Sequence, residues 1–267
     1  MPEFQTHEPG TFCYAELAST DPDASGAFYM ELFGWSRNDQ DLGEFGIYTQ
    51  FELGGKTVAA QYRMPDEQKD AGVPPNWGQY LSVADVDATA ARAAELGGQL
   101  VMGPMDVFEH GRMAVLADPA GAVFCLWQAG ENIGVALKDD PGTMCWNELL
   151  TRDTTAAGEF YGGLFGWRAE TMDMGDMGEY TTFRAGQDRP AAGMMAIAPD
   201  MGPTPPHWMV YFAVADCRAS QEKAAGMEAE TLVPPTEIPG MGVFSVLKDP
   251  VGSVFGMYQS LVEGREV

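Results

Sequence analysis

The sequence predicts an α+β fold made by tandem duplication of one unit. The peptide "AFYMELFGWS" at 27–36 nearly recurs as "EFYGGLFGWR" at 159–168, 132 residues later in a chain of 267. Each copy also mixes segments that alternate like strands with segments of helical periodicity. A similar offset relates three further pairs of motifs: "PGT" at 9–11 and 141–143, "VAD" at 83–85 and 214–216, and "DPAGAVF" at 118–124 with "DPVGSVF" at 249–255. This repeat predicts two units, at 1–130 and 141–267, joined by a linker at 131–140.

Each copy begins with a predicted strand followed by a capped helix. The segment "TFCYAELAS" at 11–19 alternates and is rich in aromatic residues, as half-buried strands are. Asp21 stands at the N-cap position of the helix, with Pro22 at the first helical position. Four residues are predicted to share the buried face of this helix: Ala24, Ala27, Phe28 and Leu32.

The repeated peptide marks the end of this helix. Gly34 suits the left-handed residue that follows a helix, and Trp35 is then expected to fold back on Tyr29 or Met30. Gly166 takes the same place in the second copy. The peptide itself therefore predicts architecture rather than chemistry.

The remaining segments of each copy predict strands around a second helix. Their order is two strands, a Pro-rich loop, one strand, a helix and three strands. In the first copy we expect the strands at 46–53, 56–64, 78–83, 99–105, 111–118 and 122–128, and the helix at 86–97. The chain would then hold four half-units, each a strand, a helix and further strands.

The composition excludes some classes of function. The chain has 15 basic and 39 acidic residues, and its net charge of −24 repels nucleic acid and anionic membranes. No apolar run approaches the ~18 residues of a membrane span, and the first residues lack the features of a signal peptide. The cysteines form no CxxC pair and fit buried thiols in a reducing compartment: Cys13, Cys125, Cys145 and Cys217. We expect a cytoplasmic protein without a nucleic-acid or membrane partner.

Three features present in both copies resemble the vicinal oxygen chelate (VOC) superfamily, the glyoxalase, bleomycin-resistance and extradiol-dioxygenase group. They are the Asp-capped helix ending in "FYxxLFGW", the mid-unit strand running into "VAD", and the closing "DPxGxxF" hairpin. The chain looks like the two-unit members common in actinomycetes, which are often labelled hydroxylases or glyoxalase-like proteins. The resemblance implies four βαβββ modules whose curled mixed sheets surround clefts.

The resemblance also implies where a divalent metal ion would bind. Metal-dependent members hold the ion with His, Gln or Glu on the first and last strands of their modules. Those positions hold Tyr14, Gly78 and Cys125 in the first copy, and Trp146, Met209 and Gly256 in the second. None is a usual ligand for a hard divalent cation, and the three histidines show no HxxxH or ExxH spacing. We therefore expect no metal and no other cofactor.

The expected clefts are aromatic, with one carboxylate each. Strand residues two apart share a face, which places Glu16 beside Tyr14 and Glu148 beside Trp146. The same parity selects the other residues expected to bind a ligand: Tyr80 and Trp127 in the first unit, and Met209, Tyr211 and Tyr258 in the second. Such a lining is the usual make-up of a small-molecule site. Gly78 and Gly256 are expected to leave room for the ligand.

Two functions are consistent with these residues. The first is a metal-free protein that binds a hydrophobic or aromatic small molecule of the antibiotic or natural-product type. The alternative is a metal-independent hydroxylase, isomerase or cyclase, with Glu16 or Glu148 as general acid or base and His110 as a further candidate. A purely structural role for the two glutamates is also consistent with the sequence. Which unit is active, and whether the chains form a homodimer, stay open at this point.

Overall fold

The computed structural model describes residues 3–175, 178–186, 189–198 and 201–262. The first half contains β1 (Phe12–Ser19), α1 (Pro22–Phe33), β2 (Ser36–Asp41), β3 (Ile47–Leu53), β4 (Lys56–Arg63), α2 (Asp66–Asp70), β5 (Asn76–Ser82), α3 (Val86–Glu95), β6 (Gln99–Val107), β7 (Gly111–Ala117) and β8 (Val123–Ala129). The second half contains β9 (Met144–Thr151), α4 (Thr154–Phe165), β10 (Arg168–Asp173), β11 (Glu179–Ala185), β12 (Arg189–Ala196), β13 (His207–Ala213), α5 (Cys217–Gly226), β14 (Glu230–Ile238), β15 (Gly242–Lys248) and β16 (Val254–Ser260). No helix in these ranges is long and apolar enough to cross a membrane.

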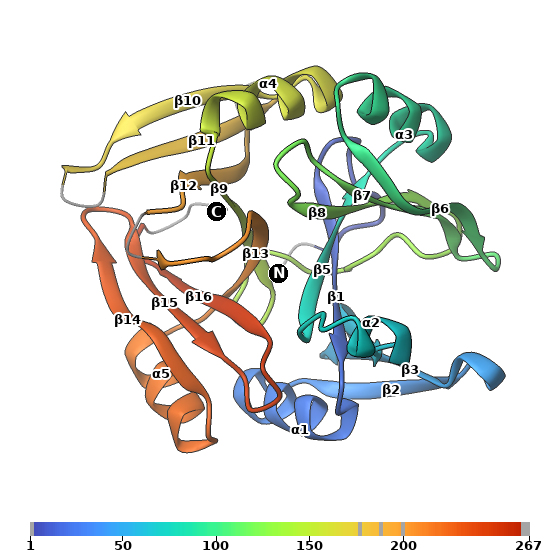
Figure 1. The fold of residues 1–267 in the computed structure, drawn as a ribbon. Coiled ribbons are helices and arrows are strands. Elements are labelled where there is room, and N and C mark those ends of the chain that lie inside the picture. Colours follow the sequence, from blue (N-terminus) through green and yellow to red (C-terminus); the bar gives the residue numbers. More distant parts are fainter. Residues whose placement is uncertain (1–2, 176–177, 187–188, 199–200, 263–267) are drawn as a thin grey trace.

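The strands form two eight-stranded mixed sheets, one in each half of the chain (Figure 1). Sheet A has the order β2-β3-β4-β1-β5-β8-β7-β6, and sheet B has the order β10-β11-β12-β9-β13-β16-β15-β14. The identical order confirms the α+β class and the duplication. No pairing joins the two end strands of either sheet in the described residues, so both sheets are open. The curled sheets implied by the resemblance are therefore not what the strand pairing gives.

The predicted elements of the first copy agree with the observed ones to within two residues at each end. The edge strands β2 and β10 escaped prediction. Their sequences, "SRNDQD" and "RAETMD", are exposed almost throughout. An edge strand with solvent on both faces needs no apolar alternation, so it lacks the pattern that identifies a strand.

Helix α1 has the predicted caps but a different buried face. The Asp21 carboxylate accepts a hydrogen bond from the backbone N–H of Ala24 at 3.2 Å, and Gly34 has a φ of 73°. The residues that are buried are Ser25, Gly26, Phe28, Tyr29 and Leu32, whereas Ala24 and Ala27 are exposed. The predicted face was therefore partly wrong. Ser25 can be buried because its hydroxyl bonds to that of Ser19 at 2.6 Å.

The two units share a hydrophobic core that lies between the two sheets. Phe12 packs against Trp208 with ring centroids 5.0 Å apart, and Trp77 packs against Phe212 at 5.2 Å. Strands β5 and β13, each in the middle of its sheet, are in contact across this core. The outer face of each sheet is thus the face that carries the predicted glutamates.

The repeated aromatic helix of one unit holds the DPxG turn of the other. The Tyr29 hydroxyl on α1 donates to the Asp249 carboxylate at 2.9 Å, and the Trp77 indole donates to the same hydroxyl at 3.0 Å. The contacts of the other copy have the same form: Tyr161 to Asp118 at 3.2 Å and Trp208 to Tyr161 at 2.8 Å. Figure 1 shows α1 beside the β15–β16 turn.

The tryptophan after each of these helices also reaches the other unit. The Trp35 indole donates to the carbonyl of Gly142 at 2.7 Å, and that of Trp167 donates to the carbonyl of Gly10 at 3.0 Å. Trp35 stacks on Tyr29, as predicted, with centroids 6.1 Å apart. The repeated motifs therefore contain the residues that hold the two units together.

The segment expected to be a linker, 131–140, packs along sheet A. Val135 and Leu137 are buried, and the Val135 N–H donates to the carbonyl of Cys13 at 2.8 Å. Gly134 has a φ of 100°, and a Cβ atom there would lie 2.2 Å from that same carbonyl oxygen. Glycine is required at this position by both the backbone conformation and the close approach.

Replacing Gly134 tests this packing. We expect Gly134→Ala to lower the free energy of unfolding by about 3 kcal/mol, because it combines a strained φ with a clash against backbone. Gly121→Ala is the matched control, since Gly121 has a φ of 98° but open space around it. The control should cost about 1 kcal/mol in urea unfolding. Equal losses for the two variants would contradict close packing of the segment.

Candidate functional site

The outer face of sheet A contains a cavity of about 110 Å³. Side chains from β1, β3, β5, β8 and the β6–β7 hairpin line it. The five residues predicted for the first unit all meet there: Tyr14, Glu16, Tyr80, His110 and Trp127. The other lining residues are Gln40, Leu42, Tyr48, Gln50, Val107, Phe108, Met113 and Asn132. The alternation of the strands thus brings together residues as far apart in the sequence as β1 and β8.

Glu16 is held between two tyrosine hydroxyls. Tyr48 donates to Glu16 Oε1 at 2.7 Å, and Tyr80 donates to Glu16 Oε2 at 2.6 Å. Burial raises the pKa of the Glu16 carboxyl above its ordinary value of 4.5, although the two hydrogen bonds act in the opposite direction. The arrangement therefore allows the carboxyl to hold or accept a proton closer to neutrality than an exposed glutamate can.

A third tyrosine extends this network along the cavity wall. The hydroxyls of Tyr14 and Tyr48 lie 3.2 Å apart. Because Tyr48 uses its single proton for Glu16, Tyr14 is the donor in this pair. Burial, followed by the charge of Glu16, raises the pKa of Tyr48 and of Tyr80 well above 10. Both hydroxyls therefore stay protonated donors at neutral pH.

Tyr48 was not among the predicted site residues. It lies on β3, whereas the prediction considered the first, fifth and eighth strands. The repeat carried a usable signal, because Tyr48 and Tyr180 occupy the same place in "YTQF" and "YTTF". A tyrosine kept on a half-buried strand in both copies could have been paired with the glutamates.

The second unit repeats the same network with an indole as the outer donor. Tyr211 donates to Glu148 Oε2 at 2.9 Å, and the Tyr180 hydroxyl also bonds to the Glu148 carboxylate. The Trp146 indole donates to the Tyr180 hydroxyl at 2.8 Å, where the first unit has Tyr14. Burial raises the pKa of Glu148 as it does that of Glu16.

The predicted residues of the second unit are packed into a hydrophobic cluster. Met209 and Tyr211 belong to it, and Trp146 and Tyr258 pack against it. A Cβ atom on Gly256 would lie 2.1 Å from the Tyr211 ring, so this ring covers Gly256. The expectation that Gly256 leaves room for a ligand was therefore wrong. Gly78 is likewise not part of the lining of the first cavity.

The two units differ in the access to their glutamates. Glu16 is partly exposed, whereas Glu148 is only 6 % exposed. One of the substitutions at matching positions lies against the packed residues of the second unit. Gln40 and His110 correspond to Met172 and Met241, which are exposed, and Met113 corresponds to Phe244. Phe244 packs against the hydrophobic cluster of the second unit.

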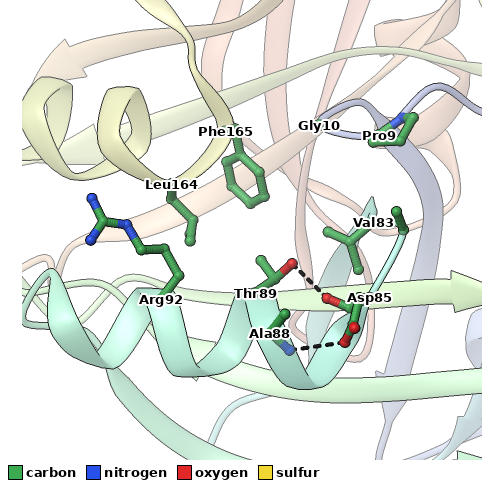
Figure 2. A pocket seen from close by; sticks show the side chains of 10 residues that line it. Pro9, Gly10, Val83, Asp85, Ala88, Thr89, Arg92, Leu164 and Phe165 are labelled. Carbon is green, nitrogen blue, oxygen red and sulfur yellow. Dashed lines mark hydrogen bonds between the residues drawn. The ribbon is translucent and has the colours of Figure 1, made fainter.

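A larger hollow, of about 360 Å³, lies between α3 and the end of α4 (Figure 2). It contains none of the predicted site residues. Its polar groups already bond to one another: the Asp85 carboxylate accepts from the Ala88 N–H at 2.9 Å, and the Thr89 hydroxyl donates to the Asp85 carbonyl at 2.7 Å. Arg92 pairs with Glu95 at 2.9 Å. These bonds all lie within α3 and its cap, whereas the predicted site residues meet in the smaller cavity, which is therefore the candidate site.

Residues 11–126 and 134–257 both match the sequence profile of the Glyoxalase/Bleomycin resistance protein/Dioxygenase superfamily. The chain belongs to this superfamily. Its relatives include the protein named as glyoxylase CFP32 in Mycobacterium tuberculosis, 38% identical over 258 residues that cover 96% of this chain and 97% of the relative. The anthracycline biosynthesis protein DnrV of Streptomyces peucetius is 36% identical over 268 residues, covering 97% and 94%.

Solved structures of the superfamily share the fold. The Mn(II)-bound glyoxalase from Novosphingobium aromaticivorans has a TM-score of 0.67 at 16% identity, covering 95% of this chain and 83% of that one. The 2,3-dioxygenase LapB from Pseudomonas sp. KL28 has a TM-score of 0.65 at 11% identity, covering 94% and 92%. At these identities the likeness establishes the fold and leaves the chemistry to the residues of this chain.

Those residues do not fit the divalent metal ion of the metal-dependent superfamily members. Such an ion needs three or more converging donors. Across the described ranges, no group of three His, Cys, Asp or Glu side chains is placed to hold an ion. In the candidate site, the lining side chains of these four types are Glu16 and His110, which are two donors rather than three. We therefore derive no chemistry through a metal here.

Proposed function

We propose that the first unit binds a small aromatic molecule in the cavity beside Glu16, and that the second unit serves as structural support. The observation that carries this proposal is the meeting of aromatic rings and a partly accessible carboxylate around one cavity of the first unit. In the other unit the same positions are packed. In this proposal, each sheet is built from two βαβββ modules, so that four modules form the framework of the site.

The size of the cavity limits what it can hold. An engineered cavity of about 150 Å³ accommodates benzene, and sites for drug-sized ligands span about 300–1,000 Å³. A space of about 110 Å³ therefore suits a single ring. A polycyclic molecule would insert one ring and extend past Phe108, whose side chain is 60% exposed. The relative DnrV is an anthracycline biosynthesis protein, which supports an aromatic ligand of this kind.

A swap between the two units tests the proposal. Met113 and Phe244 occupy matching positions on β7 and β15. We expect wild-type protein to bind benzyl alcohol with a Kd of about 1 mM or tighter, because the probe has few atoms. Met113→Phe should weaken binding at least about tenfold by filling the space, whereas Phe244→Met should leave it within about twofold.

The measurement is an NMR titration of each variant with the probe. Thermal unfolding of both variants serves as the control for folding. Binding that survives Met113→Phe but is lost in Phe244→Met would place the site in the second unit and refute the proposal.

A second candidate function is metal-independent acid–base catalysis by Glu16. The observation that favours it is the burial of this carboxylate, which raises its pKa, together with its contact with the cavity. A raised pKa makes the ionised carboxylate a stronger base than an exposed glutamate, which suits general acid–base catalysis. Tyr48 and Tyr80 would hold the carboxylate in place during the transfer. The test of this function is given in the Discussion.

A further inference from the structure

The cavity beside Glu16 contains a carboxyl group without a lysine or arginine partner. Glu16 is the one carboxyl side chain in the lining, and His110, which also lines the cavity, makes no hydrogen bond or ion pair with it. In the described part of the chain, the side chains that influence the pKa of the Glu16 carboxyl are Tyr80 and Tyr48, and no cationic side chain is among them. Burying an ionised carboxylate without a cationic partner is costly, so a cationic ligand would supply what the site lacks.

The carboxylate still has acceptor capacity for such a ligand. Each of its oxygens accepts one tyrosine hydroxyl, at 2.7 Å from Tyr48 and 2.6 Å from Tyr80. A carboxylate oxygen can accept two hydrogen bonds, so one site on each oxygen stays available. Because Glu16 is partly exposed in the cavity, a bound ligand can reach it.

Aromatic rings surround the same space. The Tyr14 and Tyr80 rings meet edge to face with centroids 6.1 Å apart, and Tyr80 and Trp127 do so at 6.3 Å. Tyr48 and Phe108 complete the aromatic part of the lining. The face of such a ring carries negative potential and attracts a cation within about 6 Å of its centroid. The aromatic rings and the carboxylate therefore both favour a positive charge on the ligand.

We propose that the ligand of this cavity carries a protonated amine on or next to its aromatic ring. The ammonium group donates hydrogen bonds to the Glu16 carboxylate and lies among the tyrosine rings, while the ligand's ring packs against Trp127 and Met113. This inference rests on the proposed function, since it names the class of molecule that the same cavity takes. An anionic ligand would be disfavoured by both the carboxylate and the rings.

Three probes of one shape test the charge directly. Benzylamine, benzyl alcohol and benzoate each place a small group on a single ring, with positive, neutral and negative charge. We titrate full-length protein with each at pH 7.5 and 150 mM salt, which screens the general attraction of a chain of net charge −24. Benzylamine should bind about tenfold more tightly than benzyl alcohol, and benzoate the most weakly.

Two variants with the same net charge show which glutamate causes the preference for benzylamine. Glu16→Gln should reduce the affinity for benzylamine about tenfold while changing that for benzyl alcohol by less than about threefold. Glu148→Gln alters the net charge by the same amount and should leave both affinities as they are. Equal losses in both variants would assign the preference to general charge and overturn the inference. The order of the three probes in wild-type protein tests it even if a variant fails to fold.

The outcomes separate this inference from the function on which it rests. Binding of benzyl alcohol as tight as that of benzylamine would overturn the amine class and leave the aromatic site standing. Tighter binding of benzoate than of benzylamine would also overturn the amine class and leave the aromatic site standing. Absence of binding for all three probes would refute the aromatic site itself.

Discussion

Asp249→Ala is expected to lower the free energy of unfolding by about 4 kcal/mol or more. Asp249 is 3% exposed, and one carboxylate oxygen accepts the backbone N–H groups of Val251, Gly252 and Ser253 at 2.7–2.9 Å. The other oxygen accepts the Tyr29 hydroxyl of the other unit. The substitution leaves buried donors without an acceptor, at about 1–3 kcal/mol for each group. Urea unfolding followed by tryptophan fluorescence measures the loss.

Tyr29→Phe isolates the contribution between the units. It removes the hydroxyl that joins Asp249 and Trp77 and keeps the turn around Asp249 intact. We expect a loss of about 1–2 kcal/mol, clearly smaller than for Asp249→Ala. The mirror variant Tyr161→Phe should behave alike, because Tyr161 contacts Asp118 and Trp208 in the same way. No loss in either tyrosine variant would contradict the reciprocal contact as a source of stability.

The acid–base function predicts that Glu16→Gln lowers proton abstraction in the cavity at least about 100-fold. A suitable probe is 5-nitrobenzisoxazole, which gives its C3 proton to a base as its N–O bond breaks, forming a coloured cyanonitrophenolate. Glu148→Gln is the matched control and should keep the rate within about twofold, because Glu148 is buried beneath the second cluster. Equal rates in wild-type protein and Glu16→Gln would refute this function.

The pH dependence of that reaction follows from the state of Glu16. Its deprotonated form is the base, and burial raises its pKa above 4.5. The rate should therefore be lost at low pH and appear as the pH rises through a value higher than that of a free glutamate. A rate that is already constant at pH 4.5 would show that another group is the base.

The duplication made much of this fold predictable. An offset of 132 residues, read from two peptides, predicted two units with the same elements. Strand parity, applied to the strands that the family resemblance selected, chose Tyr14, Glu16, Tyr80 and Trp127, which meet at one cavity. Parity works because successive side chains of a strand point to opposite faces. It does not depend on the packing of any particular side chain.

Strand parity and the repeat could not predict the contacts between the units. They also could not predict the difference between the two clefts. Tyr29 and Asp249 lie 220 residues apart, and no local pattern pairs an aromatic helix with a distant turn. The filling of the second cleft depends on the orientation of the Tyr211 ring over Gly256. That orientation is decided by side-chain packing in three dimensions, where a glycine in the sequence suggested open space instead.

Methionine methyl NMR tests the central claim most directly, because Met113 lines the first cavity and Met209 lies in the second cluster. The protein is labelled with 13C in its methionine methyl groups and titrated with benzyl alcohol, and the two signals are assigned with Met113→Leu and Met209→Leu. The account predicts a saturable shift of the Met113 methyl signal and a constant Met209 signal. A saturable shift of Met209 with an unchanged Met113 would contradict it, since the ligand would then enter the cleft that we describe as packed.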